Sequence, residues 1–150
     1  LLSRDYTDLT HVDWAESASL SLQRSLGCEA PRIKWVVGDL LKWEPGQPID
    51  LWHDRAVFHF QIDLESINNY LESVHRNVRR GGYVLIATFH LDGPKKCSGL
   101  PVKRYDEYSM LAVLNSYGAV KWTAVKSAIW KHVTPAGIEQ YFQYLLARRG

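Results

Sequence analysis

The sequence is poor in the residues that mark several classes of protein. It has only two cysteines, Cys28 and Cys97, which lie far apart and form no CxxC pair. Two distant cysteines indicate free thiols in a reducing compartment, so we expect a cytoplasmic protein. No apolar run approaches the ~20 residues that a membrane-spanning helix needs, and no signal peptide is visible. The sequence therefore predicts a protein with no membrane partner.

Net charge is also small. The 18 Lys and Arg residues nearly balance the 16 Asp and Glu residues, which leaves a formal net charge of +2. This charge gives no argument for a nucleic-acid partner or a membrane surface. The six histidines show neither HxxxH nor HxH spacing, so we expect no metal site. The six tryptophans fit a core and pocket walls better than a surface that stacks nucleic-acid bases.

The order of patterns along the chain predicts an α/β fold. The chain has 150 residues, 46% of them hydrophobic, which suits one domain with a substantial core. Runs typical of strands alternate with runs typical of helices, which favours a mostly parallel sheet; the last two strands favour an antiparallel hairpin with a turn at 134–137. The expected strands are 9–12, 33–37, 49–53, 83–89, 120–130 and 140–146, and the expected helices are 17–26, 64–78 and 106–117.

Side chains capable of chemistry gather after the expected strand at 49–53. This strand runs into a loop that contains Asp54, Arg55 and His59. A helix follows, then a turn at Gly81-Gly82, then the buried strand at 83–89. In open α/β sheets, ligands bind outside the carboxyl ends of the strands. A reaction is therefore expected at this loop.

These motifs resemble those of the class I S-adenosylmethionine-dependent methyltransferases. In many small-molecule enzymes of that family, a strand opening with Asp-hydrophobic precedes an apolar-His-His element, a helix, Leu-Lys/Arg-Pro-Gly-Gly and an apolar strand. Here Asp50-Leu51 opens the strand, and Ala56–Phe60 stands for the His-His element, with Phe60 in place of the second His. Val78–Gly82 stands for the turn, with Arg80 in place of Pro.

The resemblance covers nearly the whole chain. It implies a Rossmann-like methyltransferase sheet with S-adenosylmethionine as cofactor. It also implies a small-molecule methyl acceptor or, less readily, a protein side chain.

The resemblance also implies that the first, central strand of the family's sheet and its Gly-rich turn are missing before Leu1. The strand ending at Asp13 matches the second strand of the family, and the only methionine is Met110. Unpaired backbone groups inside a sheet are costly. We therefore expect upstream residues, a partner chain in a homo-oligomer, or direct pairing of strands 9–12 and 49–53 to fill the gap.

Residues 1–150 are thus expected to form a single, N-terminally incomplete methyltransferase-like domain. If the chain begins at Leu1, we do not expect it to be a compact, cooperatively folding monomer. The methionine half of the cofactor site rests largely on the missing turn, so weak binding of adenosine-like ligands and no methyl transfer are expected.

Four residues carry the expected adenosine site. The resemblance implies that Asp13 accepts hydrogen bonds from the ribose diol and that Trp14 lies against a face of the adenine. It also implies that Asp39 accepts a hydrogen bond from the adenine amino group and that the backbone N–H of Leu40 donates one to the ring. A purely structural role stays open for both acids, because Asp13 can cap the next helix and Asp39 can be a polar strand end.

Three residues carry the expected chemistry. Methyl transfer is an in-line displacement, which needs alignment and, where the acceptor carries a proton, a base. His59 can be that base or a structural residue that bonds within the loop. Asp54 can hold the acceptor or the methionine end of the cofactor, and Arg55 can pair with an anionic acceptor or with Asp54.

The long polar loop at 90–104 is placed for an acceptor lid. It carries His90, Asp92, Lys95, Lys96 and Cys97, of which the two lysines are better explained as solvated residues. His75, on the helix at 64–78, is expected at the surface. Two other interpretations stay open: a catalytically silent α/β module that serves oligomerisation or binding, and a different nucleotide-binding enzyme such as a reductase.

Overall fold

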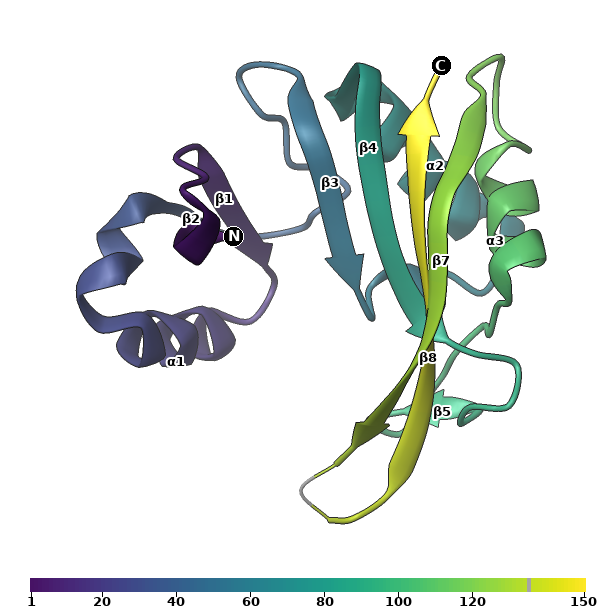
Figure 1. Ribbon diagram of the computed structural model, residues 1–150. Coiled ribbons are helices and arrows are strands. Elements are labelled where there is room, and N and C mark those ends of the chain that lie inside the picture. Colours follow the sequence, from purple (N-terminus) through teal and green to yellow (C-terminus); the bar gives the residue numbers. More distant parts are fainter. Residues whose placement is uncertain (135) are drawn as a thin grey trace. The chain divides into compact units, whose positions relative to one another are not determined.

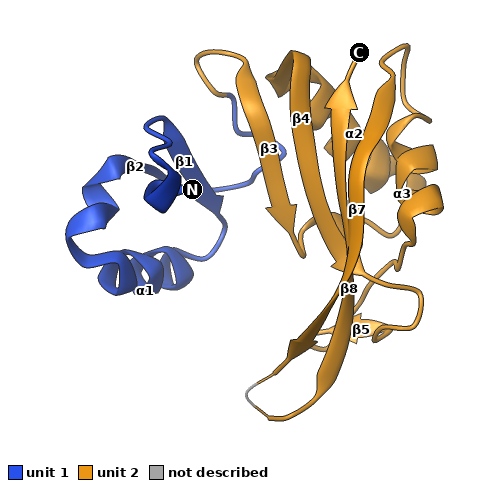
Figure 2. Ribbon diagram, viewed as in Figure 1, with its two compact units in different colours: residues 1–44 blue, residues 45–150 orange. Residues whose placement is uncertain are grey.

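A computed structural model describes residues 1–134 and 136–150, which form two compact units, Leu1–Glu44 and Pro45–Gly150 (Figures 1 and 2). Pro135, in the turn expected between the last two strands, lies outside the described residues. The single domain expected from the sequence stays a prediction.

The unit Leu1–Glu44 is a small parallel strand–helix–strand unit. Strand β1 (Leu9–Asp13) pairs in parallel with β2 (Ile33–Val37), and α1 (Glu16–Leu26) connects them. At the start of α1, the Asp13 carboxylate accepts a hydrogen bond from the Ala15 N–H at 2.7 Å. The helix ends at Gly27, whose φ of 54° is a conformation that glycine adopts without strain.

The unit Pro45–Gly150 is a four-stranded sheet with two helices on one face (Figure 1). The strand order is β3-β4-β8-β7, with β3 parallel to β4 and with β8 antiparallel to both β4 and β7. A two-residue hairpin pair, β5 and β6, lies in the loop after β4. The bounds are β3 (Ile49–Arg55), α2 (Leu64–Asn77), β4 (Val78–Phe89), β5 (Lys96–Cys97), β6 (Leu100–Pro101), α3 (Glu107–Leu114), β7 (Trp122–Val133) and β8 (Glu139–Arg149).

The α/β class expected from the alternating pattern is confirmed. Both connections through α1 and α2 join parallel strands, and the last two strands form an antiparallel hairpin. Strands β1 and β3 belong to separate sheets, so the described residues contain no direct pairing of the two.

Helix α2 forms because its capping and its apolar spacing agree. The Asp63 carboxylate accepts from the Ser66 N–H at 2.8 Å and so satisfies a free donor of the first turn. Ile67, Leu71 and Val74 recur at helical spacing and are buried. Each such side chain contributes about 1.5–3 kcal/mol on burial, and together they fix α2 against the sheet.

The Gly81-Gly82 pair, expected to form a turn, lies instead within an irregular stretch of β4. Ile49 pairs with Val78 and Leu51 with Tyr83, so Arg79–Gly82 stands opposite the single residue Asp50. A Cβ on Gly82 would lie 2.9 Å from the Arg79 carbonyl oxygen and 3.1 Å from the Asp50 carbonyl oxygen. The glycine is therefore required by a close approach of backbones.

The expectation that His75 is a surface residue is wrong. His75 is only 8% exposed, and its Nε2 accepts a hydrogen bond from Trp122 Nε1 at 2.8 Å. The end of α2 is covered by the beginning of β7 as well as by β4, so its buried face is wider there than the apolar stripe predicts.

Among residues 1–134 and 136–150, no helix combines the length and the hydropathy that a membrane span requires. The same residues contain no group of three or more His, Cys, Asp or Glu side chains placed to hold a metal ion.

Replacing Gly82 with alanine tests the close approach in β4. We expect Gly82→Ala to lower the free energy of unfolding by about 1–3 kcal/mol, the range for overpacking a well-packed site. Gly46→Ala in the same unit is the matched control, because a Cβ there meets no atom within 4 Å. Urea unfolding measures both, and equal stabilities of the two variants would contradict the irregular stretch described above.

Candidate functional site

The carboxylate of Asp54, near the end of β3, organises the loop that follows. It is 2% exposed and accepts from the backbone N–H groups of Val57 and Phe58, both at 2.9 Å. The Tyr70 hydroxyl of α2 donates to it at 2.6 Å and accepts from Trp52 Nε1 at 3.1 Å. One side chain thus ties the strand, the loop and the helix together.

Burial raises the pKa of Asp54, since the charged carboxylate is removed from water. The hydrogen bonds from Tyr70, Val57 and Phe58 act in the opposite direction because they stabilise the charged form. Burial and the neighbouring Asp54 charge raise the pKa of the Tyr70 hydroxyl, which remains a proton donor to Asp54.

The loop after β3 holds a backbone conformation that is unusual outside glycine. Ala56 has a φ of 67°, and its N–H donates to the Ala87 carbonyl of β4 at 2.9 Å. Non-glycine residues in this region cost of the order of 1–3 kcal/mol and occur often at functional sites. The strained residue lies between Arg55 and the 3₁₀ turn Phe58–Phe60.

His59, in that 3₁₀ turn, is completely buried, and neither ring nitrogen has a hydrogen-bond partner among the described residues. Its ring packs against Phe60 at 4.5 Å and Phe89 at 5.0 Å between centroids. Burial lowers the pKa of His59 to about 4, so the imidazole is neutral near pH 7. Burying a neutral imidazole with two unpaired nitrogens lowers the stability of the fold, which indicates a role for His59 other than stability.

Arg55 points away from Asp54, because neighbouring residues of a strand face opposite sides of the sheet. Its guanidinium carbon lies 5.1 Å from the centre of the Phe142 ring of β8. Arg55 is exposed, and no carboxylate pairs with it in the described part of the chain. The expected alternative of an Asp54–Arg55 ion pair is therefore absent.

In the unit Leu1–Glu44, Asp13 is the last residue of β1 and Asp39 follows the adjacent parallel strand β2. The Gly38 N–H donates to the Asp13 carbonyl at 3.0 Å and joins the two strand ends. The Asp13 Oδ1 accepts from the Ala15 N–H in the turn before α1, so the expected capping of the helix itself by Asp13 is absent, while Oδ2 is 4.0 Å from His11 Nε2. Trp14 is 73% exposed, so its indole face is open to a ligand.

Asp39 and Leu40 present polar groups at the same strand end. The Asp39 Oδ1 accepts from the Leu41 N–H at 2.9 Å, and its Oδ2 lies 3.9 Å from the Lys42 ammonium. The Leu40 N–H makes no hydrogen bond within residues 1–134 and 136–150. A free backbone donor beside a carboxylate matches the donor and acceptor pattern of an adenine edge.

The structure thus gathers the predicted site residues in two groups, one in each unit. Asp54, Arg55 and His59 share the loop after β3, and Asp13, Trp14, Asp39 and Leu40 share the ends of β1 and β2. A shallow pocket of about 400 Å³ in the unit Leu1–Glu44 is elsewhere, near the beginning of β2, with Arg24 and Trp35 in its lining.

Sequence reasoning missed three aromatic residues of the site. Tyr70 donates a hydrogen bond to Asp54, and the Tyr105 ring stacks on the Phe58 ring with 5.2 Å between centroids. The Phe142 ring lies under the guanidinium of Arg55. The alternation of β8 places Phe142 on a definite face, which could have suggested a contact. No pattern in the sequence pairs Tyr70 with Asp54 across 16 residues.

The loop at 90–104 contributes less than expected of a lid. Cys97 packs half-buried against the cluster of Ala87, Phe89 and Phe142. His90 Nδ1 lies 3.2 Å from the Asp92 carboxylate. The adjacent lysines, 95 and 96, are exposed, as a solvated loop predicts.

No protein-family model matches the sequence, and no curated protein is a significant match. Solved structures do match. TehB from Haemophilus influenzae has a TM-score of 0.67 at 20% identity, over 94% of this chain and 49% of its own. The N-methyltransferase NodS from Bradyrhizobium japonicum has a TM-score of 0.69 at 15% identity, over 94% of this chain and 72% of its own.

A third match is the 1,6-didemethyltoxoflavin-N1-methyltransferase from Burkholderia thailandensis, solved with 1,6-didemethyltoxoflavin and S-adenosylhomocysteine. Its TM-score is 0.71 at 21% identity, over 99% of this chain and 63% of its own. The matched segment is thus between about half and three quarters of these proteins. The chain has the Rossmann-like α/β fold of S-adenosylmethionine-dependent methyltransferases.

Replacing His59 with leucine tests the unpaired imidazole. We expect His59→Leu to raise the free energy of unfolding by about 1–3 kcal/mol at pH 7, because two unsatisfied polar atoms leave the core. The depressed pKa means that the unfolded chain binds a proton first as pH falls. Wild-type stability is therefore lost between about pH 6.5 and 4, by at most about 1.4 kcal/mol per unit, and the advantage of the variant grows over that range.

His75→Leu is the matched control, because it removes a buried histidine that has a partner. It should destabilise the protein by leaving Trp122 Nε1 without its acceptor. Chemical denaturation at several pH values measures both variants. A loss of stability in His59→Leu equal to that in His75→Leu would show that His59 has a partner after all.

Proposed function

We propose that this chain binds S-adenosylmethionine and takes part in methyl transfer to a small molecule. The observation that carries the proposal is the set of open polar groups at the carboxyl ends of the parallel strands β1 and β2, in a chain with the methyltransferase fold. In such sheets, ligands bind at these strand ends. The small-molecule acceptor is supported by the third match, whose solved structure holds 1,6-didemethyltoxoflavin.

The residues of the unit Leu1–Glu44 fit the adenosine part of the cofactor. One carboxylate oxygen of Asp13 has no bonded donor, so it can accept from a ribose hydroxyl. The exposed Trp14 indole can lie against the adenine, and the free Leu40 N–H can donate to the ring. When bound, S-adenosylmethionine supplies an electrophilic methyl group on a positively charged sulfur.

The loop after β3 would position the acceptor. With three donors already on its carboxylate, Asp54 holds the loop in shape rather than binding a ligand itself. With a pKa of about 4 and a completely buried ring, His59 is a weak base near pH 7, so we assign it no part in proton transfer. Where the acceptor carries a proton, that proton would leave to solvent as the acceptor atom takes the methyl group and the carbon–sulfur electron pair stays on sulfur.

The remaining parts of the proposal are a cytoplasmic location, no nucleic-acid partner, and assembly through a strand edge. In the described residues, β3 has a partner on one side only, β4. That free edge supports pairing with a further strand, from another copy or from the same polypeptide.

Adenosine tests the cofactor site, because it carries the adenine and the ribose diol without the amino-acid end. We expect weak binding to the 150-residue protein by ligand-observed NMR. Asp13→Asn should weaken that binding by about 1–3 kcal/mol, or roughly 5–150-fold, because it removes one carboxylate oxygen. The variant keeps an acceptor for the Ala15 N–H, so the turn before α1 survives.

Asp8→Asn is the control of equal charge change, since Asp8 makes only an exposed ion pair with Lys34. It should leave adenosine affinity unchanged. If adenosine does not bind the wild type, the proposal fails in favour of a silent module. If Asp13→Asn binds as well as the wild type, Asp13 has only the structural role of holding the turn before α1.

A further inference from the structure

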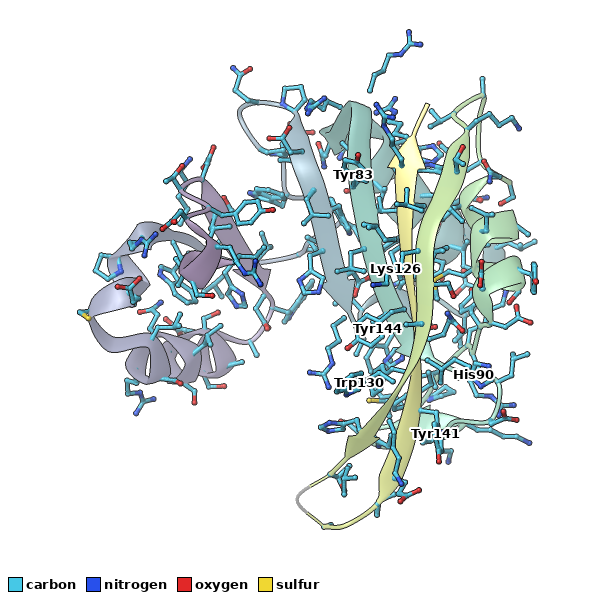
Figure 3. All side chains as sticks on the ribbon, in the orientation of Figure 1. Tyr83, His90, Lys126, Trp130, Tyr141 and Tyr144 are labelled. Carbon is cyan, nitrogen blue, oxygen red and sulfur yellow. The ribbon has the colours of Figure 1, made fainter. Side chains whose placement is uncertain are left out.

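The face of the sheet opposite α2 and α3 carries a group of aromatic side chains around Arg55. Trp52 and Asp54 of β3 contact α2 through Tyr70, so the intervening strand residues face the other side. The register places two adjacent rows there: Arg55, Ala87 and Tyr144, then Phe89, Phe142 and Trp130. We call Arg55, Phe142, Tyr144 and Trp130 the aromatic surface; Figure 3 labels Tyr144 and Trp130 on β8 and β7.

The guanidinium of Arg55 is held in place but keeps its hydrogen-bonding capacity. It lies over the Phe142 ring at 5.1 Å, a cation–π contact that uses the face of the group and leaves its N–H edge free. The described residues offer that edge no carboxylate. A planar fork of N–H donors is suited to bidentate binding of a carboxylate.

The aromatic part of this surface is open to solvent at Trp130 and in part at Tyr144, while Phe142 is 4% exposed. Trp130 is 65% exposed, and Tyr144 is half-buried with its ring 6.5 Å from that of Phe142. Ala87, between Arg55 and Tyr144 in the row, is completely buried, because Ala56, Cys97, Val102 and Tyr144 pack against the cluster of Ala87, Phe89 and Phe142. A flat ring can therefore approach the exposed parts of Tyr144 and Trp130, next to the exposed Arg55.

The charge of the face selects for anions. Its strand residues include no Asp or Glu, while His53 and Lys126 are exposed on the same side. A cationic ligand would find no counter-charge among the strand residues of this face.

We infer that the aromatic surface binds the methyl acceptor and that the acceptor is a planar aromatic anion. Its carboxylate would take two hydrogen bonds from Arg55, and its ring would lie against Tyr144 and Trp130. The inference rests on the proposed function, because it places the acceptor beside the carboxyl end of β3. It goes further by naming the chemical class of that acceptor.

Three probes of one shape but different charge test the class. They are 4-hydroxybenzoate, 4-hydroxybenzamide and 4-hydroxybenzylamine, titrated into the 150-residue protein by ligand-observed NMR without any methyl donor. We expect the anion to bind roughly tenfold tighter than the neutral amide, as a charge-assisted bidentate pair implies, and the cation to bind least.

The variants assign the effect to residues. Arg55→Met should bring the anion to the affinity of the amide and leave the amide unchanged. Trp130→Ala should weaken both probes alike, because it removes ring contact only. Arg148→Met, on the same face near the opposite end of β8, is the control of equal charge change and should keep the preference for the anion.

Equal affinities for the three probes, or an anion preference that survives in Arg55→Met, would overturn the inference. The adenosine titration separates this result from the proposed function. Adenosine binding without an anion preference rejects the acceptor class alone. An anion preference lost in Arg55→Met, in a protein that does not bind adenosine, supports the surface and rejects the methyltransferase proposal.

Discussion

The buried Asp54 carboxylate is the interaction on which the second unit depends. A carboxylate with 2% exposure survives in a core only if its oxygens are satisfied, and here two backbone N–H groups and the Tyr70 hydroxyl do so. These three bonds fix the path of residues 55–60 and the position of α2 against β3. The strained Ala56 and the unpaired His59 both lie within the segment that this carboxylate holds.

Because side chains alternate along a strand, the neighbouring charges of Asp54 and Arg55 face opposite sides of the sheet and have different roles. Asp54 faces α2 and organises the interior, while Arg55 faces the open side of the sheet and rests on Phe142. A chain of rings connects the two sides of this corner: His59 contacts Phe89, and Phe89 contacts Phe142. The site therefore has a polar interior around Asp54 and an exposed Arg55 on the other side of the sheet.

The sequence predicted the parts of the fold that depend on local pattern. Helical spacing located α2, the apolar run located β4, and the loop after β3 was placed at a strand end. Features that depend on distant contacts were not predictable: the burial of His75 requires Trp122, 47 residues away, and the irregular stretch of β4 requires Asp50. In the same way, the residue types of Asp54 and Arg55 suggested an ion pair, and only the pleat of the strand shows that they diverge.

Strand β8 has a consequence for the order of events in folding. It is the last strand in the chain, yet it lies between β4 and β7 in the sheet. During synthesis, the edge of β4 that pairs with β8 consequently stays unpaired until residues 139–149 leave the ribosome. An apolar strand exposed for that interval is prone to wrong pairing and aggregation. Cells producing this protein would therefore benefit from chaperones that shield nascent chains, and slow translation between β4 and β8 would lengthen the period of risk.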